Sequence, residues 1–244
     1  MKFSEYYKEQ VKVIRERDPS IHRDREALLY PFFWAMWAYR KAHREYEKGN
    51  FYKARKISQK AARKTGIEIH PGAVIGEGFF IDHGTGVVIG ETTVIGKNVT
   101  LYQGVTLGGT GKQLGKRHPT LEDNVMVSAG AKVLGAITVG ENSKIGAGSV
   151  VIRDVPPNST VVGIPGRVAK QDNVHIPRLN LDQVDLPDPV ANMIELLKDE
   201  NDTLKQTLRI LEKQQEDDHI RIDRNSQAVS VLESRLQLTD GAGI

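Results

Sequence analysis

The sequence predicts an α+β protein: an N-terminal α-helical region, then a parallel β-helix built from six-residue repeats, then a C-terminal helical or coiled-coil segment with a flexible tail. Three observations carry this prediction. Apolar residues recur at helical spacing before residue 66, aliphatic residues recur every six positions between 67 and 170, and a heptad pattern begins at residue 190. Each period belongs to a different kind of structure, so the chain divides where the period changes.

The first segment, residues 1–66, is expected to be helical. Its apolar residues lie three and four apart, which is the pattern of a buried helix face: Leu28, Leu29, Phe32, Phe33, Met36 and Trp37. Pro31 suits an early helical turn, where the missing N–H has no partner to lose. The pair Asp18-Pro19 indicates a break between helices, because the residue before a proline avoids the α conformation.

The second segment, residues 67–170, carries the six-residue repeat. Its aliphatic positions are Ile69, Ile75, Ile81, Ile89, Ile95, Leu101, Leu107, Leu121, Val127, Val133, Val139, Ile145 and Val151. An α-helix cannot place every sixth residue on one face, since six residues turn through about 600°. A triangular solenoid can: each repeat forms one side, the aliphatic side chain points inward, and a glycine such as Gly76 or Gly90 turns the corner.

A polar linker, residues 171–189, leads to a predicted helix or coiled coil, residues 190–238, and a tail, residues 239–244. The helix places residues at alternating spacings of four and three: Val190, Ile194, Leu197, Asn201, Leu204, Leu208 and Leu211. This spacing with one polar Asn201 favours a short coiled coil. A single amphipathic helix folded back on its own subunit is the alternative.

Composition excludes several classes of function. The 34 Lys and Arg against 31 Asp and Glu leave a net charge of +3, too small to favour nucleic acid as a partner. The absence of cysteine excludes disulfides, thiolate nucleophiles and cysteine-type zinc sites. The N-terminus has no apolar signal core, and the longest apolar stretch, residues 31–39, is far short of the roughly 20 residues that span a bilayer. A soluble, cytoplasmic protein is expected.

The repeat is broken twice, and each break carries a histidine. Ile81 and Ile89 are eight residues apart, and Leu107 and Leu121 are fourteen apart, two beyond a double step. The first break contains His83. The second contains Arg117-His118 after a glycine-rich run and is expected to form a protruding loop. Insertions in solenoids concentrate function because the packed core is left undisturbed.

His83 is the candidate general base. Histidine titrates near neutral pH, and a basic histidine needs a carboxylate to orient its ring. Glu68 lies fifteen residues earlier, and one coil of such a solenoid takes about eighteen residues. The two side chains are therefore expected to come close on one side of the prism.

A metal site is the competing chemistry. The γ-class carbonic anhydrases use this fold and bind zinc through three histidines, two of them five residues apart. Here Asp123 stands five residues after His118, and His70 is the only other histidine within the repeats. The sequence therefore predicts a site without metal.

Four runs of residues resemble the serine O-acetyltransferase family. They are IEIHPGA at 67–73, IDHGTGVVIGET at 81–92, QGVTLGGTGK at 103–112 and KRHP at 116–119. The resemblance covers roughly residues 10–170 and includes Arg17-Asp18-Pro19. It implies a left-handed β-helix, although parallel crossovers are normally right-handed. It also implies transfer of an acetyl group from acetyl-CoA to L-serine, the first committed step of cysteine biosynthesis.

The resemblance assigns the catalytic roles. His83 would remove the serine hydroxyl proton, so that the oxygen attacks the thioester directly without an acyl-enzyme. Glu68 would orient His83 and stabilise its imidazolium, where many members of the family have aspartate. Asp18 and Asp82 would bind the serine ammonium group.

Arg117 and His118 would bind the serine carboxylate, for which guanidinium offers two parallel hydrogen bonds. In the family the site is shared between neighbouring subunits of a homotrimer, so these groups can come from different chains. The family also contains dimers of trimers, and the sequence leaves the choice open. Acetyl-CoA would lie between adjacent prisms, against four candidate residues: Gly109, Ala129, Ala147 and Arg167.

The tail suggests a protein partner. In several members of the family a C-terminal isoleucine enters the active site of O-acetylserine sulfhydrylase, and this chain ends at Ile244. A free carboxylate with one apolar side chain is a plausible captured peptide. The alternative is a frayed end with a chance isoleucine. Feedback inhibition by cysteine, common in the family, would act at the serine site.

Two other functions compete with serine acetylation. One is acetyl transfer to a sugar or xenobiotic hydroxyl on the same scaffold, which would gain little from Asp18, Asp82 and Arg117. The other is a scaffold that mainly regulates the sulfhydrylase, which would not need His83. Thiol release from acetyl-CoA with serine, homoserine or a sugar as acceptor separates these functions.

Overall fold

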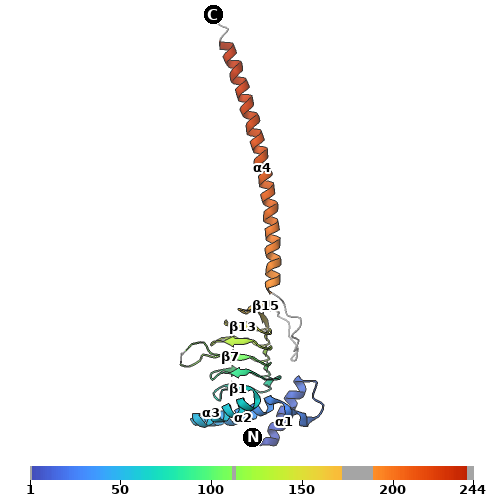
Figure 1. Ribbon diagram of the computed structural model, residues 1–244, viewed down its shortest axis with the longest axis vertical. Helices are drawn as coiled ribbons and strands as arrows, with labels where there is room; N and C mark the ends of the chain where they lie inside the picture. Colours follow the sequence, from blue (N-terminus) through green and yellow to red (C-terminus); the bar gives the residue numbers. More distant parts are fainter. Residues whose placement is uncertain (1, 112–113, 172–188, 241–244) are drawn as a thin grey trace. The chain divides into compact units, whose positions relative to one another are not determined.

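The computed structural model of the chain describes residues 2–111, 114–171 and 189–240 (Figure 1). The chain divides into two compact units, Met1–Pro189 and Val190–Ile244. Among the described residues, no helix is long and apolar enough to cross a membrane. The predicted class, helices followed by a parallel β-helix and a C-terminal helix, is confirmed.

The N-terminal helices are α1 (Phe3–Arg17), the 3₁₀-helix η1 (Asp24–Leu29), α2 (Pro31–Glu47) and α3 (Phe51–Thr65). Pro31 is the first residue of α2, and Gly66 ends α3 with a φ of 73°, a left-handed conformation that glycine adopts freely. Phe32, Phe33 and Met36 are buried as predicted. Leu29 is 80% exposed, contrary to prediction, because it belongs to η1 and not to the buried face of α2.

The β-helix consists of short strands that follow one another around a prism. The first nine are β1 (Ile67–Ile69), β2 (Val74–Ile75), β3 (Phe80–Ile81), β4 (Val87–Ile89), β5 (Val94–Ile95), β6 (Thr100–Leu101), β7 (Thr106–Gly108), β8 (Thr120–Leu121) and β9 (Met126–Val127). The remainder are β10 (Lys132–Leu134), β11 (Thr138–Val139), β12 (Lys144–Ile145), β13 (Val150–Val151), β14 (Ser159–Val162) and β15 (Arg167–Gln171).

These strands stack into three sheets, which are the three sides of the prism (Figure 1). Their orders are β1-β4-β7-β10-β13, β11-β8-β5-β2 and β15-β14-β12-β9-β6-β3. All pairs are parallel except β14 with β15. The repeated aliphatic residues are buried inside the prism, apart from Ile75, which is only partly buried. The six-residue period therefore encodes one inward side chain per side, as predicted.

The three corners of the prism have different contents. The His83 corner comprises residues 82–86, 102–105, 128–131 and 146–149, which lead from the sheet of β3 to the sheet of β1. The His118 corner comprises residues 70–73, 90–93, 109–111 and 114–119, which follow β1, β4 and β7. The asparagine corner comprises residues 76–79, 96–99, 122–125 and 140–143, which follow the strands of the sheet that contains β2.

Both breaks in the period are insertions at corners. In the first coil Ile67 pairs with Val87, and in the second Val88 pairs with Thr106, so the first coil is longer than the second by two residues. The first break therefore adds its two residues to the His83 corner. In the coil that contains the second break, Thr106 pairs with Lys132. That coil is eight residues longer than the second coil, and all eight residues are inserted within one six-residue repeat. The sequence had indicated instead two repeats with two extra residues.

A ladder of asparagines runs along the asparagine corner and continues one coil further, to Asn158. Asn98, Asn124, Asn142 and Asn158 have φ values between 56° and 60°, in the left-handed region. Their amides bond in series: Asn98 Nδ2 donates to Asn124 Oδ1 (3.4 Å), Asn124 to Asn142 (3.0 Å) and Asn142 to Asn158 (3.0 Å). Asparagine tolerates this conformation better than other non-glycine residues, so it turns the corner and connects the coils.

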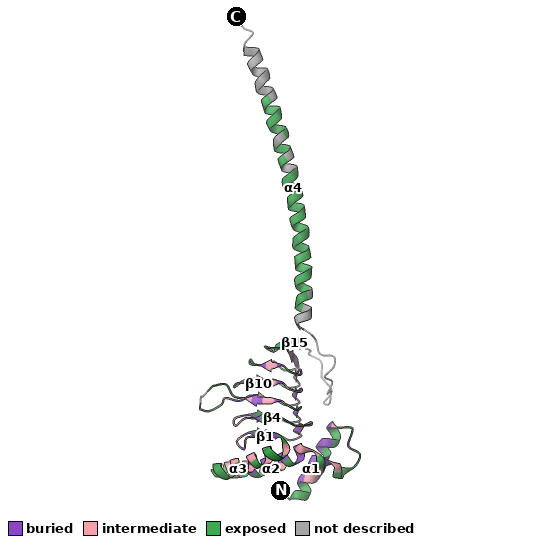
Figure 2. Cartoon of the chain, in the orientation of Figure 1, coloured by how far each residue is buried: buried purple, intermediate pink, exposed green. Residues whose placement is uncertain are grey.

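The second unit contains one helix, α4 (Pro189–Asp240), of 52 residues. Its side chains are exposed wherever they are described (Figure 2). Those of the heptad stripe are between 49% and 63% exposed: Ile194, Leu197, Leu204, Leu208 and Leu211. A row of large aliphatic side chains thus lies uncovered along a long helix.

Candidate active site

The His83 corner gathers three of the predicted site residues. Asp82 and His83 follow β3, and Asp18 stands at the C-terminal end of α1. The charges of Asp18 and Asp82 act on each other, and His83 acts on both. Tyr30, which the sequence analysis did not single out, donates a 2.5 Å hydrogen bond to Asp18 Oδ2, and the Ser20 backbone N–H donates to Oδ1 (2.8 Å). Two carboxylates and a histidine therefore form one polar cluster.

The two carboxyl groups differ in their acidity. Burial alone would raise the pKa of Asp18, but hydrogen bonds from Tyr30 and Ser20 outweigh it and hold that pKa below its ordinary value. Burial raises the pKa of Asp82, and the neighbouring His83 only partly offsets this effect. A bound ammonium group would stabilise both carboxylates in their charged form.

His83 is held outward by an unusual backbone. Its φ is 56°, which a residue with a side chain adopts rarely, and its side chain is exposed. The next residue, Gly84, lies against Ile67, so that a Cβ at Gly84 would overlap with the Ile67 side chain. Such conformations persist where the surroundings enforce them, often at functional sites. The two inserted residues thus project the imidazole toward solvent.

Arg17 attaches the end of α1 to the prism and so places Asp18. Its guanidinium is buried, donates to the carbonyls of Gly78 (3.3 Å) and Asn98 (3.4 Å), and also bonds the Thr100 hydroxyl. These acceptors lie on or next to the sheet of β3, immediately before the His83 corner. The buried Arg17 side chain therefore holds the end of α1, and with it the Asp18 carboxylate, against the β-helix.

Glu68 contacts the third N-terminal helix. It lies on β1 and pairs in register with Val88, because the first coil is longer than the regular coil by two residues. Its carboxylate accepts a hydrogen bond from Gln59 Nε2 (3.0 Å) and lies 3.9 Å from Arg55 Nη2, both from α3.

The His118 corner gathers the second group. Arg117 Nη2 donates to Glu91 Oε2 (2.5 Å), and Tyr46 donates to Glu91 Oε1 (2.9 Å). Burial would raise the pKa of Glu91, but the bonds from Tyr46 and Arg117 lower it overall, so Glu91 is an anion. Tyr46, from α2, thereby helps to orient the Arg117 guanidinium through a shared carboxylate.

Thr92 is the polar centre of this corner. Its Oγ1 accepts from the backbone N–H groups of Arg117 (3.0 Å) and His118 (3.1 Å) and lies 2.9 Å from His118 Nδ1. The Thr92 backbone N–H donates to the same Nδ1 (3.2 Å), and Lys116 Nζ donates to the Thr92 carbonyl (2.8 Å). One threonine thus fixes the end of the inserted loop.

The His118 ring is buried among glycines. Burial lowers its pKa, and Arg117 lowers it further, so both favour the neutral ring. A Cβ at Gly90 would overlap with the ring, and one at Gly109 would lie 3.1 Å from Nε2. Gly109, predicted to contact CoA, therefore belongs to the same corner as His118.

The other predicted CoA residues lie elsewhere. Ala129 and Ala147 occupy successive levels of the His83 corner: Gly104 N donates to Thr85 O, Gly130 N to Gln103 O and Gly148 N to Ala129 O. Arg167 is exposed and begins β15, after the turn at Gly163 that bonds to Val150. His83, Ala129 and Ala147 thus share one edge of the prism.

Within one chain the predicted site is divided. Asp18, Asp82 and His83 lie at one corner, and Arg117 and His118 at another, with the sheet of β1 between them. Three polar residues at these corners, Tyr30, Glu91 and Thr92, were not predicted from the sequence. The position of Glu91 and Thr92, in the turn directly below the second break, could have indicated their role from the sequence. Ile244 and the linker residues 172–188 lie outside the described residues, as does Lys112 of the glycine-rich run.

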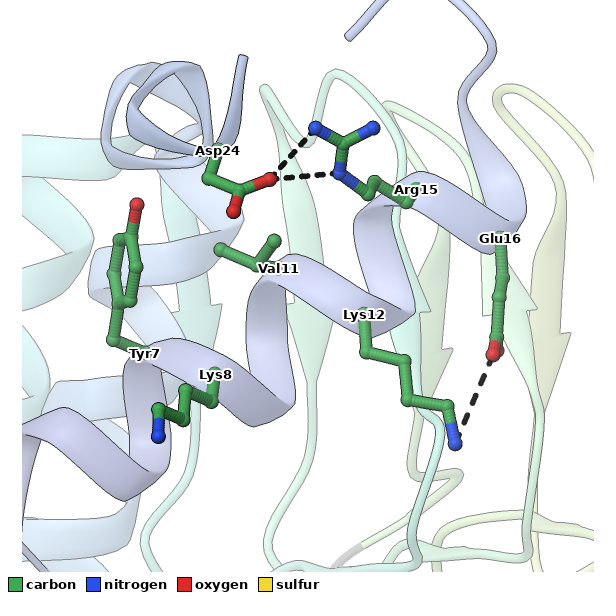
Figure 3. Close-up of a pocket in the computed structure, with 7 residues that line it drawn as sticks. All are labelled: Tyr7, Lys8, Val11, Lys12, Arg15, Glu16 and Asp24. Atoms are coloured by element: carbon green, nitrogen blue, oxygen red, sulfur yellow. Dashed lines mark hydrogen bonds and ion pairs between the residues drawn. The ribbon is translucent and has the colours of Figure 1, made fainter. Parts of the chain in front are cut away.

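Two further features bear on the site. In the described part of the chain, no group of three His, Asp or Glu side chains could hold a metal ion. A hollow beside α1 is lined by Tyr7, Lys8, Val11, Lys12, Arg15, Glu16 and Asp24 (Figure 3). It contains none of the predicted site residues, and Arg15 within it bonds to Asp24.

Comparisons with known proteins agree with the fold. The family model "Bacterial transferase hexapeptide (six repeats)" matches residues 118–153. The serine acetyltransferase of Bacillus licheniformis is 57% identical over 215 residues, which are 88% of this chain and 99% of that protein.

Two solved structures are similar to this chain. That of Neisseria gonorrhoeae serine acetyltransferase in complex with serine has a TM-score of 0.65 and 44% identity, over 68% of this chain and 69% of the other. That of a serine acetyltransferase in complex with cysteine has a TM-score of 0.70 and 40% identity, over 75% and 71%.

Proposed function

Since the chain belongs to the serine acetyltransferase family, we propose that its own residues carry out acetyl transfer from acetyl-CoA to the hydroxyl of L-serine. The reaction yields O-acetylserine, the precursor for cysteine synthesis. The observation that carries the residue assignment is the grouping of charges at two corners. One corner offers carboxylates for an ammonium group, and the other offers a cation for a carboxylate.

The mechanism requires one base and no covalent intermediate with the protein. His83 takes the proton from the serine hydroxyl, whose oxygen attacks the thioester carbon. The carbon–sulfur bond then breaks, and the CoA thiolate leaves and takes the proton from the His83 imidazolium. Glu68 is retained as the residue that orients His83. Positioning of the two substrates supplies much of the remaining acceleration.

Acceptor recognition rests on charge. Asp18 and Asp82 bind the serine ammonium, and Arg117, oriented by Glu91, binds the carboxylate together with His118. A neutral sugar would gain little from these four groups. Cysteine carries the same ammonium and carboxylate as serine, so an inhibitory cysteine would compete for the same residues.

The division of the site supports a shared active site. The two groups lie at different corners of one prism, so a homotrimer would place the His83 corner of one subunit beside the His118 corner of the next. Acetyl-CoA would lie in this groove, along Ala129 and Ala147 on one side and near Gly109 on the other, with Arg167 toward its phosphates. A trimer and a dimer of trimers remain alternative assemblies.

Two further partners complete the proposal. The exposed stripe of α4 favours association with α4 of other copies of the chain. Ile244 would be captured by O-acetylserine sulfhydrylase, and deletion of Ile244 should abolish that binding; unchanged affinity would exclude the idea. A cytoplasmic location fits a biosynthetic reaction that consumes acetyl-CoA.

Thiol release from acetyl-CoA tests the function. The purified full-length protein is expected to release CoA with L-serine, much less with homoserine, and not with a sugar. His83→Ala should lower kcat by roughly 10²-fold or more, the usual contribution of a positioned base. A folded protein without serine-dependent release would refute the function, and a near-normal His83→Ala rate would remove His83 from its role.

A further inference from the structure

The hydrogen bonds around Thr92 determine where His118 carries its proton. A backbone N–H can only donate, so the Thr92 N–H facing His118 Nδ1 requires a lone pair on that nitrogen. The Thr92 hydroxyl already accepts from two backbone N–H groups, those of Arg117 and His118. Its own hydrogen is therefore free to point at Nδ1, 2.9 Å away. Two donors thus converge on Nδ1, and the ring proton must reside on Nε2.

The other ring nitrogen, Nε2, therefore carries the proton. The side of the ring that bears Nε2 packs closely against Gly90 and Gly109, where even a Cβ atom would overlap with the ring or press on it. The absence of side chains at these two positions allows the ring to sit against the backbone. In the proposed function, the Nε2–H is the group that His118 donates to the acceptor carboxylate.

We propose that Thr92 is a positioning residue that locks His118 in its neutral, Nε2-protonated form, so that His118 offers one uncharged N–H to the acceptor carboxylate. This inference rests on the proposed function, because it concerns the same carboxylate. In this arrangement Arg117 supplies the positive charge, and His118 supplies a directional hydrogen bond to the carboxylate. A second cation so near Arg117 would instead repel it.

The surroundings favour a neutral ring. The charged or titratable groups that act on it are Arg117 and Lys116 from the loop, Glu91 from the turn below, and His70 from the level beneath. Arg117 already bonds to Glu91, and the burial of the ring together with its cationic neighbours lowers the pKa of His118. Carboxylate binding should therefore not require proton uptake by His118.

The first test reads the tautomer directly in the full-length protein. Long-range ¹H–¹⁵N spectra of histidine-labelled protein, with His118 assigned from a His118→Gln variant, distinguish the two neutral tautomers and the imidazolium. We expect the Nε2-protonated form at pH 7. A proton on Nδ1, or an imidazolium at pH 7, would overturn the proposal regardless of activity.

The second test uses a matched pair of variants. Thr92→Val keeps the shape and removes the hydroxyl, whereas Thr92→Ser keeps the hydroxyl. We expect Thr92→Val to raise the KM for serine roughly tenfold, with kcat within about threefold, and to make this KM depend on pH between 6 and 7. Thr92→Ser should stay near the parent enzyme. An unchanged KM in Thr92→Val, or equal losses in both variants, would contradict the role.

These measurements separate the inference from the function on which it rests. If the parent protein released no thiol with serine, the proposed function would fail, yet the tautomer spectrum would still decide how Thr92 holds His118. If Thr92→Val did not fold, the spectrum of the parent protein and the kinetics of Thr92→Ser would still test the proposed role of Thr92. A parent protein that is active with serine but has the wrong tautomer would reject only the inference.

Discussion

At the scale of single residues, the site is defined by which polar groups are satisfied within the chain and which are left for a ligand. Glu91 is fully engaged by Tyr46 and Arg117, and Thr92 is engaged by the loop above it. Asp82 and His83 are less constrained. The chain thus fixes the half proposed to bind the carboxylate firmly and leaves the half proposed to transfer the proton more open.

Glu68 is the residue whose role most needs a test, because its described bonds go to α3. Glu68→Gln is expected to lower kcat at least roughly tenfold with little change in the KM for serine, while Glu68→Asp retains activity, if the carboxylate orients His83. Steady-state kinetics and thermal unfolding should be measured together. Normal kcat with reduced stability would mean that Glu68 only ties β1 to Arg55 and Gln59.

His70 should make stability depend on pH. Burial lowers its pKa to about 4, so the folded ring stays neutral where the unfolded ring, titrating near 6.5, takes up a proton. Stability is therefore complete above pH 6.5 and is lost as the pH falls toward 4, by on the order of 1–2 kcal/mol after allowance for partial exposure.

His70→Asn keeps an acceptor for the Gly72 N–H, which bonds to Nδ1 at 3.0 Å, but cannot titrate. Urea unfolding at fixed protein concentration should show a shallower loss of stability between pH 6.5 and 4 in this variant. Parallel curves for the two proteins would show that His70 is not the group responsible.

At the scale of elements, the six-residue period was sufficient to predict the β-helix, because each repeat buries one aliphatic side chain and the strand is too short for any other pattern. The N-terminal helices were predictable from Phe32, Phe33 and Met36. The position of Leu29 was not, since a 3₁₀ turn changes which residues face inward. The strand partner of Glu68, Val88, depends on the true length of the first coil, which only the strand register reveals.

The asparagine ladder allows backbone and side-chain contributions to be separated. Asn142→Ala loses two amide hydrogen bonds and forces alanine to adopt a φ of 58°. Asn142→Gly loses the same bonds but adopts that φ freely. We expect losses in the free energy of unfolding of about 2 kcal/mol for alanine and about 1 kcal/mol for glycine. Equal losses would show that the backbone conformation carries no cost, and an unaffected glycine variant would show that the ladder adds nothing.

At the scale of the whole molecule, the two-corner arrangement is what the sequence could not show. Residue types predicted ammonium and carboxylate binding, but the order along the chain does not reveal that Asp82 and Arg117 turn different corners of the prism. That separation depends on how many strands lie between them and on where the eight-residue insertion falls. It supports an active site completed by a second copy of the chain.

Self-association through α4 is testable because its aliphatic stripe is exposed. Leu204→Asp should reduce helix content and the mass of the assembly, since a charge in a coiled-coil core is costly. Gln206→Asp, a substitution outside the stripe, is the matched control and should change neither. Circular dichroism and light scattering give the readouts. Identical behaviour of Leu204→Asp and the control would show that α4 stands alone.

The edge of the prism that carries His83, Ala129 and Ala147 advances by one strand spacing, about 4.8 Å, with each coil. Ala129 stands two levels above His83 and Ala147 three. An acyl carrier bound along this edge therefore spans a distance that is fixed by the number of coils, and this number sets how far its thiol end reaches. Deleting one whole coil above Gln103 would leave the chemistry of His83 intact but shorten this edge by one strand spacing. The length of the solenoid would then help to determine which acyl donor fits.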